Sequence, residues 1–147
     1  MKYINEITIN APIEKVVHLF DDSENLEKWM TGLISIEHLS GDLGKVGSTY
    51  KLKFKMGKRE MEMIETIQVK NLPDLFITTY DVKNVWNEVR THFEKIDDST
   101  TKYWTENEFK MKGFMKLMAF FMPGAFKKQS QKYLVLFKEF VEKEVKQ

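Results

Sequence analysis

Residues 114–147 have the sequence FMKLMAFFMPGAFKKQSQKYLVLFKEFVEKEVKQ, which contains the longest helical pattern in the chain. From Phe126 onward, apolar side chains recur at the spacing of a helix that buries one stripe. These side chains are Tyr133, Leu134, Phe137, Phe140, Val141 and Val145. A stripe with so many aromatic rings needs a broad apolar surface to pack against, and the upstream sequence predicts mainly strands. We therefore expect a curved sheet wrapped around this C-terminal helix.

The composition is that of a soluble globular protein. The chain has 147 residues, of which 42% are apolar and 31% charged, a size and balance typical of one domain spanning residues 1–147. It contains no cysteine, which excludes disulfides and thiolate metal sites. The first ten residues alternate and include Glu6, unlike a signal peptide, and no apolar run approaches the roughly 20 residues of a membrane span. We expect a cytoplasmic location.

The charge is unevenly distributed. Residues 110–147 hold nine lysines and three glutamates, a local charge of +6, whereas the whole chain carries +1. Nucleic-acid binding requires basic residues interleaved with exposed aromatic or polar side chains that contact bases. These lysines fall mostly on the outer face of the predicted helix, where a solvated surface is the simpler explanation. The sequence therefore predicts no nucleic-acid partner.

The remaining pattern predicts one strand, two short helices and six strands. The strand covers residues 3–9, the helices cover 13–20 and 24–29 with Ser23 as N-cap, and the six strands cover 33–39, 46–56, 60–69, 75–82, 85–96 and 101–111. Short turns join the six strands, so consecutive strands are antiparallel. The predicted class is α+β, in the order β-α-α-β6-α, with about seven strands.

Several short motifs occur in the order expected of a known superfamily. They are Ile9 to Val16 (INAPIEKV), Asp22 with Asn25, Leu26, Lys28 and Trp29, then Val46-Gly47-Ser48 and Asn71 to Pro73. Together they resemble the polyketide cyclase and START-like superfamily, also called SRPBCC, over the whole chain. The resemblance implies the helix-grip fold. Because that fold carries binding proteins, cyclases, dehydratases and regulators, the resemblance does not select among these functions.

In such a fold a curved sheet and a straight helix leave space between them. The side chains predicted to line it are Tyr50, Leu52, Phe54, Met61, Met63, Glu65, Val89, Thr91, Tyr103, Thr105, Asn107 and Phe109 from the strands, and Phe126, Ser130, Tyr133, Leu134 and Phe137 from the helix. A mostly apolar pocket of this kind is typical of a small-molecule site, here for a lipid, an isoprenoid or an aromatic compound. The alternative is that these side chains fill a solid core.

Glu65 stands out because it alternates with Met61, Met63 and Ile67, and with Val69 beyond them. If those side chains face inward, Glu65 does too, and a buried carboxyl can orient a ligand or transfer a proton. We favour the simpler interpretation, in which a bulge turns Glu65 to water. If the protein is a cyclase or dehydratase, as the resemblance allows, Glu65, Tyr103 or Asn107 would transfer protons. The three histidines lack metal-ligand spacing, and the sequence predicts neither metal nor cofactor.

The stretch from Met115 to Phe126 is apolar on nearly every side, and lysines flank it. We expect a short helix that Pro123 and Gly124 interrupt. Three interpretations are open. It is a buried connector or a lid over the pocket, which we favour, or it contacts an anionic membrane surface, or it forms a homodimer interface.

Overall fold

The computed structural model describes residues 1–146, apart from the side chain of Met56. The strands are β1 (Lys2–Ile9), β2 (Leu33–Ser40), β3 (Thr49–Met56), β4 (Arg59–Asn71), β5 (Leu75–Val82), β6 (Val85–Asp97) and β7 (Thr100–Met111). The helices are α1 (Ile13–Asp21), the 3-10 turn η1 (Ser23–Asn25), α2 (Leu26–Trp29), α3 (Phe114–Phe121) and α4 (Pro123–Val145). None of the helices in this part of the chain is long and apolar enough to cross a membrane.

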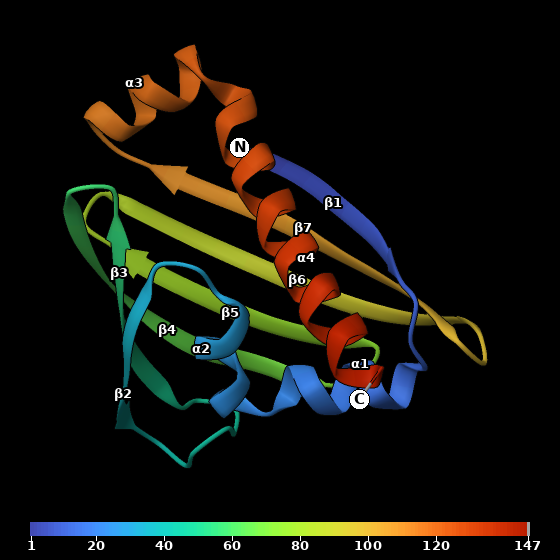
Figure 1. Cartoon of the computed structure of the whole chain (residues 1–147). Helices are drawn as coiled ribbons and strands as arrows, with labels where there is room; N and C mark the ends of the chain where they lie inside the picture. Colours follow the sequence, from blue (N-terminus) through green and yellow to red (C-terminus); the bar gives the residue numbers. More distant parts are fainter. Residues whose placement is uncertain (147) are drawn as a thin grey trace.

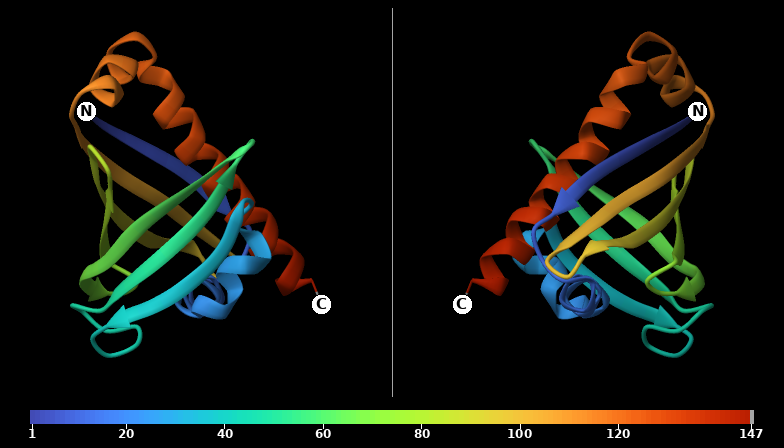
Figure 2. Two further views of the ribbon diagram at one scale, coloured as in Figure 1. Left: turned by 90° about the vertical axis from the view of Figure 1, so that its left-hand side faces the viewer. Right: turned by 90° about the vertical axis from the view of Figure 1, so that its right-hand side faces the viewer.

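The seven strands form one antiparallel sheet in the order β1-β7-β6-β5-β4-β3-β2. Strands β2 to β7 follow one another as a meander, and β1 joins the sheet beside β7. The sheet is strongly curved, and α4 runs diagonally across its concave side (Figures 1 and 2). The predicted helix-grip α+β architecture is therefore confirmed.

The short helices close one end of the concave side (Figure 1). Pro12 precedes α1, where its missing N–H and fixed φ suit the start of a helix. The prediction that Ser23 caps the second helix was wrong. Instead the Asp22 carboxylate accepts a hydrogen bond of 3.1 Å from the Glu24 amide, and Ser23 lies inside a 3-10 turn that leads into α2.

Helix α4 begins at Pro123, three residues before the predicted start, because proline is well suited to the first helical turn. It lies along β1, where the Tyr3 and Ser130 hydroxyls are 2.7 Å apart. Asn5 donates hydrogen bonds to the Lys127 carbonyl and to the Gln131 side chain. These polar contacts anchor the N-terminal half of α4 to the edge of the sheet.

Two separate apolar clusters make up the core. The larger lies beneath the C-terminal half of α4, where Phe137 and Val141 are fully buried against α1, β6 and β7. Four aromatic rings surround Phe20 within 6.3 Å, namely Phe76, Phe93, Tyr103 and Phe137. The second cluster holds Tyr50, Leu52, Phe54 and Ile67, below α2 and β2. The two clusters share no member, so the region of the inner face between them is not part of either core.

Helix α3 stands at the opposite end of the molecule, next to the end of β7 (Figure 2). Its only buried residue is Ala119, while Phe120 is 78% exposed. The interpretation of this segment as a buried connector was therefore wrong. Pro123 separates α3 from α4 instead of interrupting one helix, since proline starts the second helix.

Candidate functional site

The inner face of the sheet carries three rows of side chains that cross the strands. The rows are Asn5, Thr105, Thr91 and Phe76, then Tyr3, Asn107, Val89, Thr78 and Ile67, then Phe109, Asn87, Tyr80, Glu65 and Tyr50. The residues at the ends of the rows meet the two apolar clusters or α4. The middle positions, in contrast, are mostly amides, hydroxyls and one carboxyl. Such groups are unusual across the centre of a packed core.

Glu65 points inward, so our preference for an exposed Glu65 was wrong. The register places it opposite Tyr50 on one side and Tyr80 on the other. A register shift does occur in β4, but it lies further along, between Ile67 and Val69. It therefore leaves Glu65 inside and removes Val69 from the face on which we expected it.

The bulge has its own consequence, because it places Lys70 opposite Phe76 on the inner side. The Lys70 ammonium lies 2.8 Å from the Asp21 carboxylate and donates to the Gly44 carbonyl at 2.9 Å. This cation is thus used to tie β4 to α1 and to the β2–β3 loop, near the end of the strand.

Glu65 lies near two hydroxyl groups, those of Tyr80 and Thr78. Thr78 donates a hydrogen bond of 3.3 Å to the Tyr80 hydroxyl, so the Tyr80 proton remains available to the neighbouring Glu65 carboxyl. Burial raises the pKa of Glu65, and the hydrogen bond from Tyr80 opposes that rise in part. Burial and the neighbouring Glu65 carboxyl raise the pKa of Tyr80 well above its usual value. Both shifts disfavour the charged form of the group concerned.

Tyr103 and Asn107, the other proposed proton-transfer residues, are both buried on β7. The Tyr103 ring stacks on Phe93 with ring centres 4.9 Å apart, and burial raises its pKa. It is close enough to Tyr80 to raise that residue's pKa further. Tyr103 thus belongs to the larger apolar cluster and lies near Tyr80.

A second polar group lies toward β1. The Asn107 amide donates to the Thr105 hydroxyl at 3.3 Å, and Asn87 donates to Asn107 at 3.5 Å. Asn5 is 2% exposed, and its Oδ1 oxygen has no hydrogen-bond partner among the described residues. A buried acceptor without a donor costs free energy, so this oxygen is suited to a donor brought by a ligand or water.

The predicted lining residues fall into two groups. Buried against the apolar clusters or within the rows are Tyr50, Leu52, Phe54, Thr91, Tyr103, Thr105, Asn107, Leu134 and Phe137. Half-buried, and so incompletely packed, are Met61, Met63, Glu65, Val89, Phe109, Phe126, Ser130 and Tyr133. The half-buried residues come from β4, β6, β7 and the N-terminal half of α4. The buried residues border them.

Sequence reasoning missed Tyr80, Thr78 and Asn5. In β5 one face carries Phe76, Thr78 and Tyr80, and the other carries Ile77, Thr79 and Asp81. The two faces differ little in polarity, so the sequence does not indicate which of them points inward. Asn5 could have been found, because it has the same parity as Tyr3, Ile7 and Ile9 in a strand that alternates clearly.

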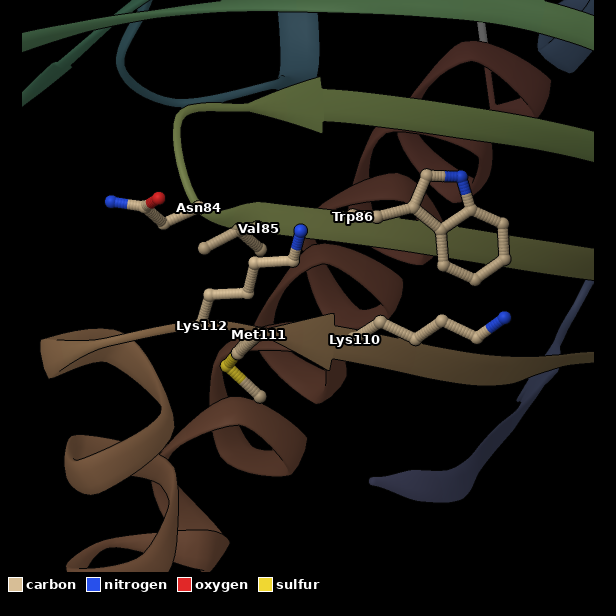
Figure 3. A pocket seen from close by; sticks show the side chains of 6 residues that line it. All are labelled: Asn84, Val85, Trp86, Lys110, Met111 and Lys112. Atoms are coloured by element: carbon tan, nitrogen blue, oxygen red, sulfur yellow. The ribbon is translucent and has the colours of Figure 1, made fainter.

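Two shallow depressions lie elsewhere on the surface. One, of about 450 Å³, is lined by outer-face residues of β1, β6 and β7 such as Arg90 and Glu106, together with Tyr3, Asn107 and Lys127. The other, of about 380 Å³, lies where β6 and β7 approach α3, and Figure 3 shows Trp86 and Lys110 beside it. The Lys110 ammonium is 4.8 Å from the centre of the Trp86 ring. Neither depression includes Glu65 or Tyr80.

No family model and no curated protein sequence matches this chain. Solved structures do match it in fold. The Zhui aromatase/cyclase from Streptomyces sp. R1128 superposes with a TM-score of 0.83 at 11% identity, over 99% of this chain and 95% of that one. Ara h 8.0201 superposes with a TM-score of 0.77 at 18% identity, over 97% of this chain and 98% of that one.

A third match is norcoclaurine synthase from Thalictrum flavum, solved with dopamine and hydroxybenzaldehyde. It gives a TM-score of 0.74 at 14% identity, over 97% of this chain and 87% of that one. Identities this low establish a common fold and no common chemistry. The chain therefore shares the helix-grip fold of these solved structures.

Proposed function

We propose that this protein binds a small, largely apolar ligand between its sheet and helix α4, as a carrier or sensor. The observation that carries the proposal is the Glu65 carboxyl on the inner face. Its pKa is shifted by burial and by Tyr80, and no cation of residues 1–146 is among the causes. A core built only for stability gains nothing from such a group, whereas a binding site gains a hydrogen-bond partner for its ligand.

Incomplete packing supports the proposal. Glu65 and Tyr80 are surrounded by protein closely enough for desolvation to raise both pKa values, yet both side chains are only half-buried. An enclosed side chain that is not fully packed borders a space. Met63, Val89 and Tyr133 are half-buried in the same way. The proposed ligand occupies that space, with its polar group at Glu65 and Tyr80.

The expected affinity follows from the apolar area. Burying about 300 Å² of ligand surface at ~25 cal/mol per Å² contributes roughly 7 kcal/mol before the cost of association. Affinities in the micromolar range are therefore accessible without strong polar contacts. A hydroxyl group on the ligand would add orientation, since it can donate to Glu65 or accept from Tyr80.

The proposal is tested with 2-naphthol, an aromatic probe that carries one hydroxyl. Titration followed by the probe's fluorescence should give one site with micromolar affinity. Val89→Trp should weaken binding at least tenfold, because the larger ring would occupy the space. Ile4→Trp is the matched control, since Ile4 is 53% exposed and faces away from the interior. Absence of saturable binding by the wild type, or equal binding by both variants, contradicts the proposal.

A cyclase or dehydratase activity on a polyketide-like substrate is the second candidate, favoured by the raised pKa of Glu65 beside the Tyr80 hydroxyl. A buried carboxyl with a raised pKa is the kind of group that serves as a general acid or base. Glu65→Gln separates the two functions. In a carrier it should change the 2-naphthol affinity by less than about threefold, whereas an enzyme should keep substrate binding and lose turnover.

A further inference from the structure

Helix α3 presents an apolar stripe to solvent. Phe114, Leu117, Met118 and Phe121 lie at the i, i+3, i+4 and i+7 positions of one helical face. Their exposed fractions are 71%, 53%, 38% and 70%. In a globular domain a stripe with this spacing normally faces the core, so its exposure indicates that something else covers it.

The exposed aromatic rings of the described chain are gathered on this one helix. Phe114, Phe120 and Phe121 are the exposed phenylalanines among residues 1–146, and Met122 adds a further apolar side chain that is 52% exposed. The other exposed large apolar residues are aliphatic side chains and Met1, most of them on strands and loops away from α3. Figure 2 shows α3 at one extreme of the molecule.

The charged residues nearest this stripe in the sequence are all lysines. From Phe109 to Lys138 the sequence contains seven lysines and no acidic residue. Lys112 and Lys116 lie immediately before and within α3, and Lys127 and Lys128 lie one to two turns into α4, all of them exposed. Lys110 and Lys112 extend from the strand that leads into α3 (Figure 3). The surface is thus apolar at its centre and cationic at its border.

We propose that α3 docks this protein on an anionic lipid bilayer, with its phenylalanines among the acyl chains and the lysines at the headgroups. Both features of the surface are satisfied by this partner, since a bilayer interface accepts an amphipathic helix and anionic lipids attract lysines. The proposal is independent of what occupies the interior of the fold.

A second copy of the chain satisfies only one of the two features. A two-fold interface places the same patch against itself, so the apolar stripes would meet but so would the two sets of lysines. Like charges facing one another across an interface oppose association, and no acidic residue of this stretch is available to neutralise them. The charge pattern therefore favours lipid over self-association.

Vesicle flotation tests the docking with defined lipids. The wild-type protein should float with vesicles of 70% phosphatidylcholine and 30% phosphatidylserine, and should remain at the bottom with pure phosphatidylcholine. The double variant F114E/F121E should lose flotation. Leu43→Glu is the matched control, because Leu43 is 67% exposed and lies in the loop between β2 and β3. This variant should float like the wild type.

The electrostatic part is tested separately and without altering the apolar stripe. Replacing Lys112 and Lys116 by Gln should lower the partition coefficient on the order of fivefold for each lysine. Raising the salt concentration from about 0.05 to 0.5 M should weaken wild-type binding, since salt screens exposed charges. The salt dependence is measured on the wild-type protein alone, so it tests the proposal even if F114E/F121E fails to fold.

Three results would overturn the proposal. The first is a wild-type protein that floats with neither kind of vesicle, above all if light scattering shows a dimer that F114E/F121E converts to a monomer. The second is equal flotation with neutral and anionic vesicles at both salt concentrations. The third is an equal loss of flotation in F114E/F121E and Leu43→Glu.

Discussion

Tyr80 and Glu65 are direct neighbours in the register of the β4–β5 pair, and the Tyr80 hydroxyl offsets part of the rise in the pKa of the Glu65 carboxyl. Among the described residues, Tyr80 is the one side chain that lowers the pKa of Glu65, and burial outweighs it. The inner face of the sheet therefore keeps a carboxyl in an environment that disfavours its charge.

The stability of the protein should depend on the protonation of Glu65. Because its pKa is raised in the folded state, the folded state binds the proton more tightly than the unfolded state, in which the pKa is near 4.5. This contribution to stability is fully present below the unfolded pKa and is lost as the pH rises through the folded pKa. Glu65→Gln carries no such loss.

Urea unfolding at pH 4 and pH 7 measures this effect. From pH 4 to pH 7, Glu65→Gln should gain stability relative to the wild type, at about 1.4 kcal/mol per pH unit between the two pKa values. Glu62→Gln is the control, an exposed carboxyl on the same strand and the opposite face. If the free energies of unfolding of Glu65→Gln and the wild type differed by the same amount at both pH values, this would falsify a raised pKa of Glu65.

Tyr80→Phe should destabilise the protein by about 1–3 kcal/mol at pH 7, since the carboxyl loses its hydrogen-bond donor. In Glu65→Gln the same change should cost less, because a neutral amide is less costly to leave without that donor. A double-mutant cycle between positions 65 and 80 should therefore give a coupling of at least 0.5 kcal/mol. Additive effects, equal to those of a cycle between positions 62 and 80, would show that the two groups do not interact.

Phe137→Ala should cost about 3–5 kcal/mol in free energy of unfolding. The ring is fully buried and lies within 6.5 Å of Phe20, Trp29, Phe93 and Tyr103, so its removal leaves a cavity at the centre of the larger cluster. Phe120→Ala, in the exposed face of α3, should change stability by no more than about 0.5 kcal/mol. Thermal or urea unfolding of both variants checks the contrast, and similar losses would contradict the core described above.

The β2–β3 loop should be less tolerant of substitution than the β3–β4 turn. Gly41 has a φ of +78°, and a Cβ there would come within 2.8 Å of the Ser48 backbone. Gly57 has a φ of +63° with no atom within 4 Å of such a Cβ. Gly57→Ala should therefore cost about 1–2 kcal/mol from backbone strain, and Gly41→Ala clearly more. Equal melting temperatures for the two variants would contradict this difference.

The sequence predicted the architecture well because most strands alternate and are joined by short turns. In β3, Tyr50, Leu52 and Phe54 alternate with lysines, and the structure buries them as expected. The orientation of Glu65 was predicted wrongly for a specific reason. A bulge was expected in β4 and does occur, but only after Ile67, and a pattern of side chains does not fix the position of a bulge within a strand.

The candidate site was predictable only in part. Tyr80 was not identified, since the two faces of β5 are similar in polarity and its partner lies on another strand. The fate of residues 114–122 was also not decided by sequence, because an apolar stripe has the same spacing whether it packs on a core or faces solvent. The contrast between α3 and α4, which have similar stripes but opposite burial, required the tertiary structure.

The central claim is that a ligand binds inside the fold beside Glu65 and Tyr80. The most direct measurement is an isotope-filtered NOE experiment on labelled protein with bound 2-naphthol. We predict cross-peaks from the ring protons of the probe to the methyl groups of Val89 and Met63 and to the ring of Tyr80. Cross-peaks confined to Phe114, Phe120 and Phe121 of the exposed helix, or no intermolecular cross-peaks at saturation, would contradict it.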